Sequence, residues 1–315
     1  MYTLKSVFRT VRLSSYLLIV LVFLAACDKE KEAPSKEVKQ FTLLPSSETG
    51  IKFSNVITDT KQANILLYNN FYGGAGVGVG DFNNDGLPDI YFAGNQVADR
   101  LYLNKGNLHF EEITEKAGIQ DDGGWSTGVT LADVNGDGHL DIYVSRELYD
   151  DKPELRENLL YINQGDGTFS EKANAYGINS NQRTRHATFL DYDNDGDLDL
   201  FLLTQPPNPG NFSEFRGANL QDPKYAMLLY QNTGEGFEEV SASAGVSLTG
   251  FPNGVSACDL NNDGWTDLYV ANDFNAADLL LINNQDGTFT NRLEEAVNHT
   301  SFYSMGVDVA DINND

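Results

Sequence analysis

A nine-residue acidic pattern recurs along this chain and limits what the chain can fold into. In the stretch DYDNDGDLDL, residues 191–200, aspartate occupies every second position, and the Asn-Asp-Gly turn in its middle interrupts any strand with one solvated face. Two carboxylates about 4 Å apart repel by roughly 1 kcal/mol even in water. Oxygens at positions 1, 3, 5, 7 and 9, with glycine at position 6, form a cage suited to Ca²⁺. The pattern therefore predicts a turn that holds a cation.

Four copies of the pattern are complete, and a fifth begins at Asp311. Their first positions lie 52 to 68 residues apart, a spacing typical of repeat architectures. We predict one Ca²⁺ in each complete loop, bound by side chains at positions 1, 3, 5 and 9 and by the carbonyl at position 7. The predicted ligands are Asp81, Asn83, Asp85, Leu87 and Asp89; Asp133, Asn135, Asp137, His139 and Asp141; Asp191, Asp193, Asp195, Asp197 and Asp199; and Asp259, Asn261, Asp263, Trp265 and Asp267. An EF-hand is disfavoured, because position 12 is strand-like in every copy instead of a bidentate glutamate.

The sequence around the loops also repeats. Each complete loop is preceded by a short apolar or glycine-containing run and followed by an apolar strand such as DIYFAG or DLYVAN. Next come a segment such as RLYLN or LLYIN, a turn such as QGDGTF, and a short closing segment that often ends in Gly-Ile or Gly-Val. Each unit is thus four short strands with the acidic loop between the first two. Four antiparallel strands per repeat predict an all-β fold, a β-propeller.

These motifs resemble the FG-GAP or VCBS repeat family, whose calcium-loop blades also occur in integrin α-subunit propellers. The flanks GVGVGDFNNDGLPDIYFAGN and SMGVDVADINND are most similar to bacterial VCBS proteins grouped with cartilage acidic protein and the ASPIC/UnbV proteins. The resemblance covers residues 41–315 and implies a calcium-binding propeller, usually of about seven blades. We place blades at about 73–119, 125–178, 183–246 and 250–297, with a fifth begun at 302.

About four blades are thus present, so the resemblance implies that the chain is a C-terminally truncated fragment of a longer protein. Residues 41–51, FTLLPSSETGI, resemble the blade-closing segment FEEITEKAGI of residues 110–119. In closed propellers an early strand often completes the last blade. Here that last blade would be absent, so we expect the strand at residues 41–51 to lack its partner.

The first 40 residues have the pattern of an export signal and a tether. A basic stretch precedes an apolar run that is too short for a comfortable transmembrane helix. The run ends in Leu-Ala-Ala-Cys27, which resembles a bacterial lipobox and implies cleavage after residue 26 and lipid attachment at Cys27. The alternative is an ordinary signal peptide with a chance cysteine. Residues 27–40 are expected to be a flexible tether, and the protein a cell-envelope lipoprotein, in the outer membrane or on the surface, although Asp28 leaves inner-membrane retention open.

Two groups are candidates for ligand binding on the propeller face opposite the calcium loops. The longest connection, residues 205–226, contains Phe212, Phe215, Arg216 and Tyr225, since long loops on a rigid scaffold often carry binding sites. The alternative is a self-packed surface loop. Arg183, Arg185 and His186 form a basic cluster, for which ion pairing to a very acidic protein is the alternative.

Charge and motifs narrow the function. The chain has 46 acidic and 21 basic residues and a formal charge of −25, which disfavours nucleic acid and anionic membrane surfaces. No Ser-His-Asp, Cys-His or HExxH pattern stands out in the sequence. We therefore expect a non-catalytic module that binds glycan or extracellular protein and meets the membrane only through its lipid. The alternative is a polysaccharide-active lyase or hydrolase built on a propeller.

Overall fold

The computed structural model describes residues 41–120, 122–206, 222–274 and 276–313. The chain divides into two compact units, Met1–Leu44 and Pro45–Asp315, and all the sheets belong to the second. The predicted signal, Cys27 and the tether lie outside the described residues, as do Phe212, Phe215 and Arg216. Within the described part of the chain, no helix is both long and apolar enough to span a membrane.

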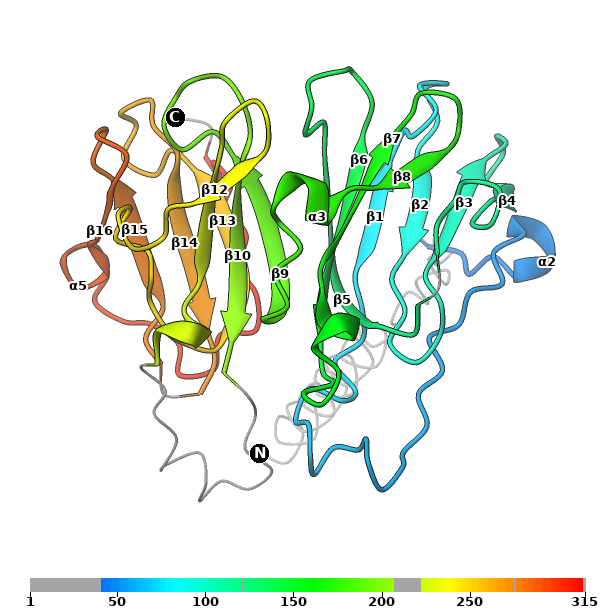
Figure 1. Ribbon diagram of the computed structural model, residues 1–315, viewed down its shortest axis with the longest axis horizontal. Helices are drawn as coiled ribbons and strands as arrows, with labels where there is room; N and C mark the ends of the chain where they lie inside the picture. The colour runs from blue at the N-terminus through cyan, green and yellow to red at the C-terminus, as the bar shows by residue number, and fades with distance from the viewer. Residues whose placement is uncertain (1–40, 121, 207–221, 275, 314–315) are drawn as a thin grey trace, which may run out of the picture. The chain divides into compact units, whose positions relative to one another are not determined.

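The second unit contains four antiparallel sheets of four strands each, and within every sheet the strands follow one another in chain order (Figure 1). Blade one has β1 (Val77–Gly80), β2 (Asp89–Phe92), β3 (Arg100–Asn104) and β4 (Phe110–Glu112); blade two has β5 (Trp125–Ala132), β6 (Asp141–Glu147), β7 (Leu159–Asn163) and β8 (Phe169–Glu171); blade three has β9 (Arg183–Leu190), β10 (Asp199–Gln205), β11 (Leu228–Asn232) and β12 (Phe237–Glu239); blade four has β13 (Pro252–Cys258), β14 (Asp267–Asn272), β15 (Leu279–Asn283) and β16 (Phe289–Asn291). The first strands β1, β5, β9 and β13 are neighbours in that order. The predicted fold class, propeller blades of four strands, is confirmed.

Short helices lie in the connections. They are α2 (Ser46–Thr49), η1 (Pro153–Arg156), α3 (Ala173–Tyr176), η2 (Pro223–Tyr225) and α5 (Leu293–Ala296). Because the strands are antiparallel, the acidic loops after the first strands lie at one end of the blades. The connections between the second and third strands lie at the other end, which we call the opposite end (Figure 1).

Apolar side chains fill the seams between successive blades. Tyr91, Ile142 and Tyr161 belong to the cluster shared by blades one and two, and corresponding clusters join blades two and three and blades three and four. Every residue of β6 and of β10 is buried, because both faces of these two strands are covered. Burial of each large apolar side chain contributes about 1.5–3 kcal/mol, so the seams hold the blades together.

The closing turns also link the blades. Gly118, Gly177 and Gly245 end these turns with positive φ, and each packs against the carbonyl of the phenylalanine that begins the last strand of the next blade. An added Cβ would lie 3.0–3.2 Å from that carbonyl oxygen in all three turns. Glycine is therefore required both for the backbone conformation and for the close approach.

The closing turn expected in residues 41–51 is present, and the segment has no strand partner among the described residues, as expected. Gly50 packs against the carbonyl of Phe110 with the same positive φ as the other closing glycines. However, residues 41–45 form no strand, and α2 follows directly. A strand needs a neighbouring strand for its backbone groups, and no described strand pairs with this segment.

Residues 302–313 follow blade four and contain no strand in the described residues. The Ser304 N–H donates to the carbonyl of Asn272 at 3.0 Å, and the Asn253 side chain donates to the carbonyl of Ser304 at 3.1 Å. Val307 lies beside Gly254, much as Val129 lies beside Gly76 between blades one and two. The segment thus lies where the first strand of a further blade would pack.

Candidate metal centres and the opposite end

All four acidic loops share one hydrogen-bonded frame. The aspartate at position 1 accepts the backbone N–H groups of positions 5 and 6 at 2.7–3.1 Å. The aspartate at position 5 accepts the N–H of position 7 at 2.9–3.1 Å. The glycines at position 6 have φ of 85–96° and the residues at position 4 have φ of 56–69°, which bends the loop tightly. This frame holds the first and fifth carboxylates in fixed orientations.

The aspartate at position 9 fixes each loop to the sheet. These four residues, Asp89, Asp141, Asp199 and Asp267, have no exposed surface. Each accepts the N–H of loop position 2 at 2.9–3.0 Å and the N–H of the last residue of the third strand at 2.7–2.8 Å. Burial raises the pKa of all four carboxyls, to about 6 for Asp141 and about 7 for Asp199. Position 9 therefore joins the loop, the second strand and the third strand, and remains a predicted ligand through its other lone pairs.

The asparagine that ends the third strand was not assigned a role from the sequence. Asn104, Asn163, Asn232 and Asn283 occupy this position, and their backbone N–H groups bond to the position 9 carboxylates. The Asn163 side chain also donates to the carbonyl of Phe82 in blade one at 2.8 Å, and Asn283 donates to Tyr192 in blade three at 2.7 Å. The sequence signal for this role was an asparagine that recurs at the end of RLYLN, LLYIN, LLYQN and LLLIN.

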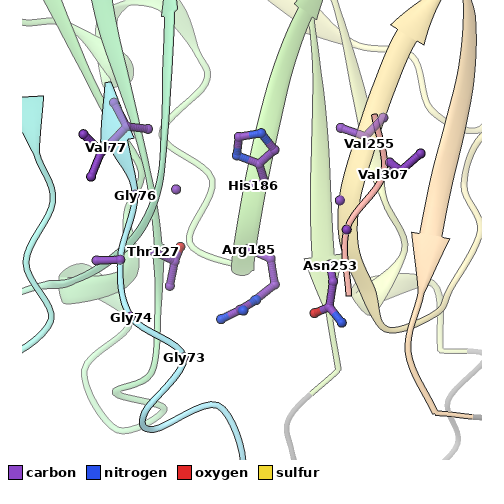
Figure 2. A pocket seen from close by; sticks show the side chains of 15 residues that line it. Gly73, Gly74, Gly76, Val77, Thr127, Arg185, His186, Asn253, Val255 and Val307 are labelled. Carbon is purple, nitrogen blue, oxygen red and sulfur yellow. The ribbon is translucent and has the colours of Figure 1, made fainter. Parts of the chain in front are cut away.

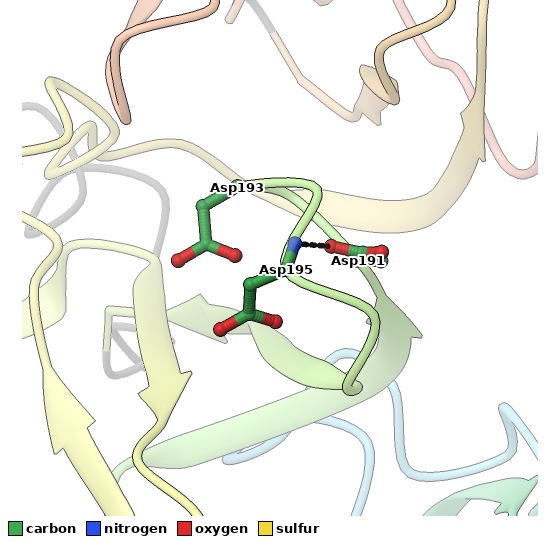
Figure 3. A group of neighbouring side chains, drawn as sticks. All are labelled: Asp191, Asp193 and Asp195. Atoms are coloured by element: carbon green, nitrogen blue, oxygen red, sulfur yellow. Dashed lines mark hydrogen bonds between the residues drawn. The ribbon is translucent and has the colours of Figure 1, made fainter.

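The third loop brings its carboxylates together most closely. Asp191, Asp193 and Asp195 each place an oxygen within 4.8 Å of the others, and Figure 3 shows the three side chains around the turn. The Asp195 N–H donates to Asp191 Oδ1, the contact drawn there. Asp193 Oδ2 accepts from Gln231 at 2.6 Å, but Asp193 Oδ1 and Asp197 Oδ1 are buried without a hydrogen-bond partner among the described residues.

The electrostatics of the third loop differ from those of the other three. Burial and the charge of Asp195 raise the pKa values of both Asp193 and Asp197. In the first and second loops asparagine replaces the third-position aspartate, and its amide donates to the fifth-position carboxylate at 3.1 Å (Asn83) and 2.9 Å (Asn135). Loop three therefore concentrates negative charge that the other loops partly relieve.

The donor set fits a hard divalent cation. Every predicted ligand atom is a carboxylate, amide or carbonyl oxygen, as Ca²⁺ prefers. Asp193 Oδ1, a buried and unpartnered oxygen of a predicted ligand in loop three, carries a desolvation cost that a cation would offset. The residues present are therefore suited to hold Ca²⁺, most clearly in loop three.

At the opposite end the residues of the predicted basic cluster do not line one common cavity. Arg185 and His186 line a cavity of about 390 Å³ beside the first strands of the blades (Figure 2). Burial and the neighbouring Arg185 charge lower the pKa of His186. Arg183 lines other cavities, one of which it shares with Tyr225, Asp150 and Arg156. Sequence reasoning missed Asp150 and Arg156, which have no recurring motif.

Arg185 takes part in a buried polar group. Its guanidinium lies 3.3 Å from Glu147 Oε2, and the Tyr68 hydroxyl donates to the same oxygen at 2.5 Å. Tyr68 and Glu147 are each only 1% exposed. Burial, followed by the Glu147 charge, raises the pKa of Tyr68. This group therefore joins the segment before blade one to blades two and three.

Four-stranded blades that each carry one acidic loop define the protein as a repeat protein with propeller blades. The family model for the FG-GAP-like repeat matches residues 59–144, 151–202 and 259–315. The chain belongs to the FG-GAP-like repeat family.

The chain is similar to cartilage acidic protein 1 of Xenopus tropicalis, with 27% identity over 232 residues that cover 73% of this chain and 33% of the relative. The human protein of the same name is 25% identical over 233 residues, covering 74% and 33%. The chain thus spans about a third of the length of the curated relatives it matches.

Two solved structures show weaker likeness. One is an Agrocybe aegerita lectin that recognises non-reducing terminal N-acetylglucosamine, with 18% identity and a TM-score of 0.31 over 68% of this chain and 64% of that chain. The other is a fructofuranosidase from Schwanniomyces occidentalis, with 11% identity and a TM-score of 0.40 over 76% and 50%. The fold assignment rests on the sheets themselves.

Proposed function

We propose that this chain is a non-catalytic, calcium-stabilised binding module whose ligand surface is the opposite end of the blades. Each acidic loop holds one Ca²⁺, which removes carboxylate repulsion and ties the first two strands together. The opposite end is then free to bind a glycan or an extracellular protein.

One observation carries the calcium part of this proposal. In loop three, the carboxylates of Asp191, Asp193 and Asp195 converge, and Asp193 Oδ1 is buried without a hydrogen-bond partner among the described residues. Unrelieved burial of such a group costs about 1–3 kcal/mol. The same backbone frame in the other three loops supports one site per blade.

The burial of one acid-containing group at the opposite end favours a binding role. Among the described residues of the opposite end, Tyr68, Glu147 and Arg185 form one group that contains an acid. Tyr68 and Glu147 are buried, so neither is placed to reach a substrate. A general acid or base must come within hydrogen-bonding reach of the reacting group.

Calcium dependence is tested by thermal unfolding. Binding to the native state alone adds about 2.7 kcal/mol per site at one hundred times Kd. Several filled sites should therefore raise Tm by about 10 °C or more relative to EGTA. Mg²⁺ at the same concentration is the control and should restore less stability, because it dehydrates reluctantly. Equal Tm values in EGTA and Ca²⁺ would refute calcium stabilisation.

Attachment to the cell envelope is a separate part of the proposal and rests on Leu-Ala-Ala-Cys27. A Cys27→Ser variant should incorporate no labelled fatty acid and should remain unprocessed or soluble. Protease treatment of intact cells then distinguishes surface display from a location inside the outer membrane. Fatty-acid labelling of Cys27→Ser at the wild-type level would overturn the lipoprotein assignment.

A further inference from the structure

A cavity of about 470 Å³ lies at the opposite end between blades two and three. Asp150 comes from the connection after β6, Arg156 ends η1, Arg183 begins β9 and Tyr225 ends η2. The volume lies within the range of small-molecule sites. Of these four residues only Arg183 lies in a strand, and the other three lie in the connections of blades two and three.

Two largely buried guanidinium groups share one carboxylate in this cavity. Arg183 bonds to both oxygens of Asp150 through Nε and a terminal nitrogen, and Arg156 bonds to Asp150 Oδ1. The Arg183 and Arg156 side chains are 8% and 15% exposed, whereas Asp150 is 58% exposed. The two cations are thus fixed in the wall, and their carboxylate partner is at the surface.

This concentration of positive charge is unusual for a chain with a formal charge of −25. Lys224 also lines the cavity, but it pairs with Asp222 at 2.9 Å. Arginine presents planar, bidentate donors that match a carboxylate. The wall is therefore suited to an anionic group that competes with Asp150 for the two arginines.

The backbone that positions Asp150 is strained. Leu148 and Tyr149, directly before it, have φ of 66° and 48°. Two consecutive non-glycine residues in the left-handed region cost about 1–2 kcal/mol each. Both residues pack against the cluster of Tyr68, Phe71 and Trp125, which holds them in place. Such strain is often found at binding sites.

Two polar atoms of the lining also indicate the kind of ligand. Arg156 Nε and Gln182 Oε1 are buried and have no hydrogen-bond partner among the described residues. One is a donor and the other an acceptor, which are the two roles that a hydroxyl group can complement. A sugar acid carries hydroxyl groups close to its carboxylate, whereas the side chains of aspartate and glutamate carry a carboxylate alone.

We propose that this cavity binds the carboxylate-bearing ring of an acidic saccharide, held by Arg156 and Arg183. Tyr225, which is partly exposed and has Lys224 Nζ 4.7 Å from its ring centroid, supplies aromatic surface, and Gln182 accepts from a ring hydroxyl. A second cavity of about 590 Å³ meets the first at Asp150 and Arg183 and gives room for a neighbouring sugar. The inference rests on the proposed function only in placing the ligand at the opposite end.

The test uses the full chain in millimolar Ca²⁺ and isothermal titration with trigalacturonate. The matched ligand is fully methyl-esterified trigalacturonate, which keeps the shape and loses the charge. We expect the ester to bind about tenfold more weakly or worse, as for a lost charge-assisted hydrogen bond. Triglutamate represents the acidic-peptide alternative and should bind more weakly than the saccharide.

Variants locate the site. Arg156→Gln should weaken trigalacturonate binding about tenfold or more, whereas Arg292→Gln, the same change at an exposed pair in blade four, should leave Kd within about twofold. Asp150→Asn should strengthen binding severalfold, because it removes the competing carboxylate and keeps both arginines. This variant remains informative if Arg156→Gln does not fold.

Several results would overturn the inference. These are no binding of trigalacturonate, equal binding of the ester, tighter binding of triglutamate, or an unchanged Kd in both Arg156→Gln and Asp150→Asn. The calcium-dependent Tm of the same samples is measured in parallel. A calcium shift without saccharide binding would refute only this inference, and saccharide binding without a calcium shift would refute only calcium stabilisation.

Discussion

The two ends of the blades differ in how closely the four repeats agree. At the end that carries the acidic loops, every blade has the same buried aspartate with the same two backbone hydrogen bonds. At the opposite end, the residue just before the third strand is Asp99, Asn158, Met227 or Asp278. One end therefore repeats a single structural solution, and the other varies from blade to blade.

The four blades differ in the hydrogen bonds that the residue before the third strand can accept. Asp99 and Asp278 each accept a backbone N–H, at 2.7 and 2.8 Å, and a tyrosine hydroxyl from the second strand. The side-chain oxygen of Asn158 also accepts a backbone N–H, that of Arg146, at 2.8 Å. Met227 in blade three is fully buried, and its apolar side chain offers no such acceptor. The arginine-lined cavity lies between the two blades that depart from aspartate, as expected where individual loops acquire a binding role.

The largest effect on stability is expected from a substitution at the end that carries the acidic loops. Asp199→Ala would leave the N–H groups of Tyr192 and Asn232 without their buried acceptor. At about 1–3 kcal/mol for each unsatisfied group, the free energy of unfolding should fall by about 2–6 kcal/mol. Urea unfolding in Ca²⁺ measures it. The exposed Glu238→Ala is the control and should change stability by about 0.5 kcal/mol or less. A similar loss in both variants would contradict a special role for position 9.

Asp193→Asn should have a smaller effect on the free energy of unfolding, and its sign should differ between EGTA and Ca²⁺. Asp193→Asn gives loop three the third-position asparagine of the other loops and removes one of its crowded carboxylates. Stability should rise by about 1 kcal/mol in EGTA, because repulsion falls, and calcium affinity should fall because an anionic ligand is lost. Asn135→Asp in loop two is the reciprocal variant and should show the opposite changes. A change in the free energy of unfolding that has the same sign in EGTA and in Ca²⁺ would argue that Asp193 does not face a cation.

The smallest stability effect is expected at the opposite end. Arg156→Gln breaks an ion pair with a half-exposed carboxylate and should change the free energy of unfolding by about 1 kcal/mol or less. Chemical denaturation in Ca²⁺ measures this change, with Arg292→Gln as the matched surface variant. A loss as large as that of Asp199→Ala would show that Arg156 is a structural residue and that the two ends do not divide their roles.

The repeats made most of the fold predictable. Alternating apolar runs around each acidic loop were sufficient for the blade architecture, because each loop marks the link between two strands in register. The closing turn at Gly50 was also visible, since it repeats the Gly-Ile ending of later blades. The lack of a strand partner for residues 41–51 was also predicted, but the segment itself forms no strand, because a strand needs a neighbouring strand for its backbone groups.

The opposite end was much less predictable. Arg183 and Asp150 are 33 residues apart, and their contact depends on the way that blades two and three pack. Tyr225 was selected as part of a long loop, but its neighbours Asp150 and Arg156 belong to no repeating motif. A role for position 9 as a buried hydrogen-bond acceptor was also missed, since a ligand and a structural aspartate have the same sequence pattern.

The central claim is that the acidic loops are cation sites, and counting bound ions tests it most directly. Equilibrium dialysis or native mass spectrometry of the calcium-saturated chain should show one Ca²⁺ for each complete loop. Asp191→Ala should remove one ion and leave the others bound, because each loop has its own ligands. A wild-type chain that binds no calcium, or an Asp191→Ala chain that binds as many ions as the wild type, would contradict the account.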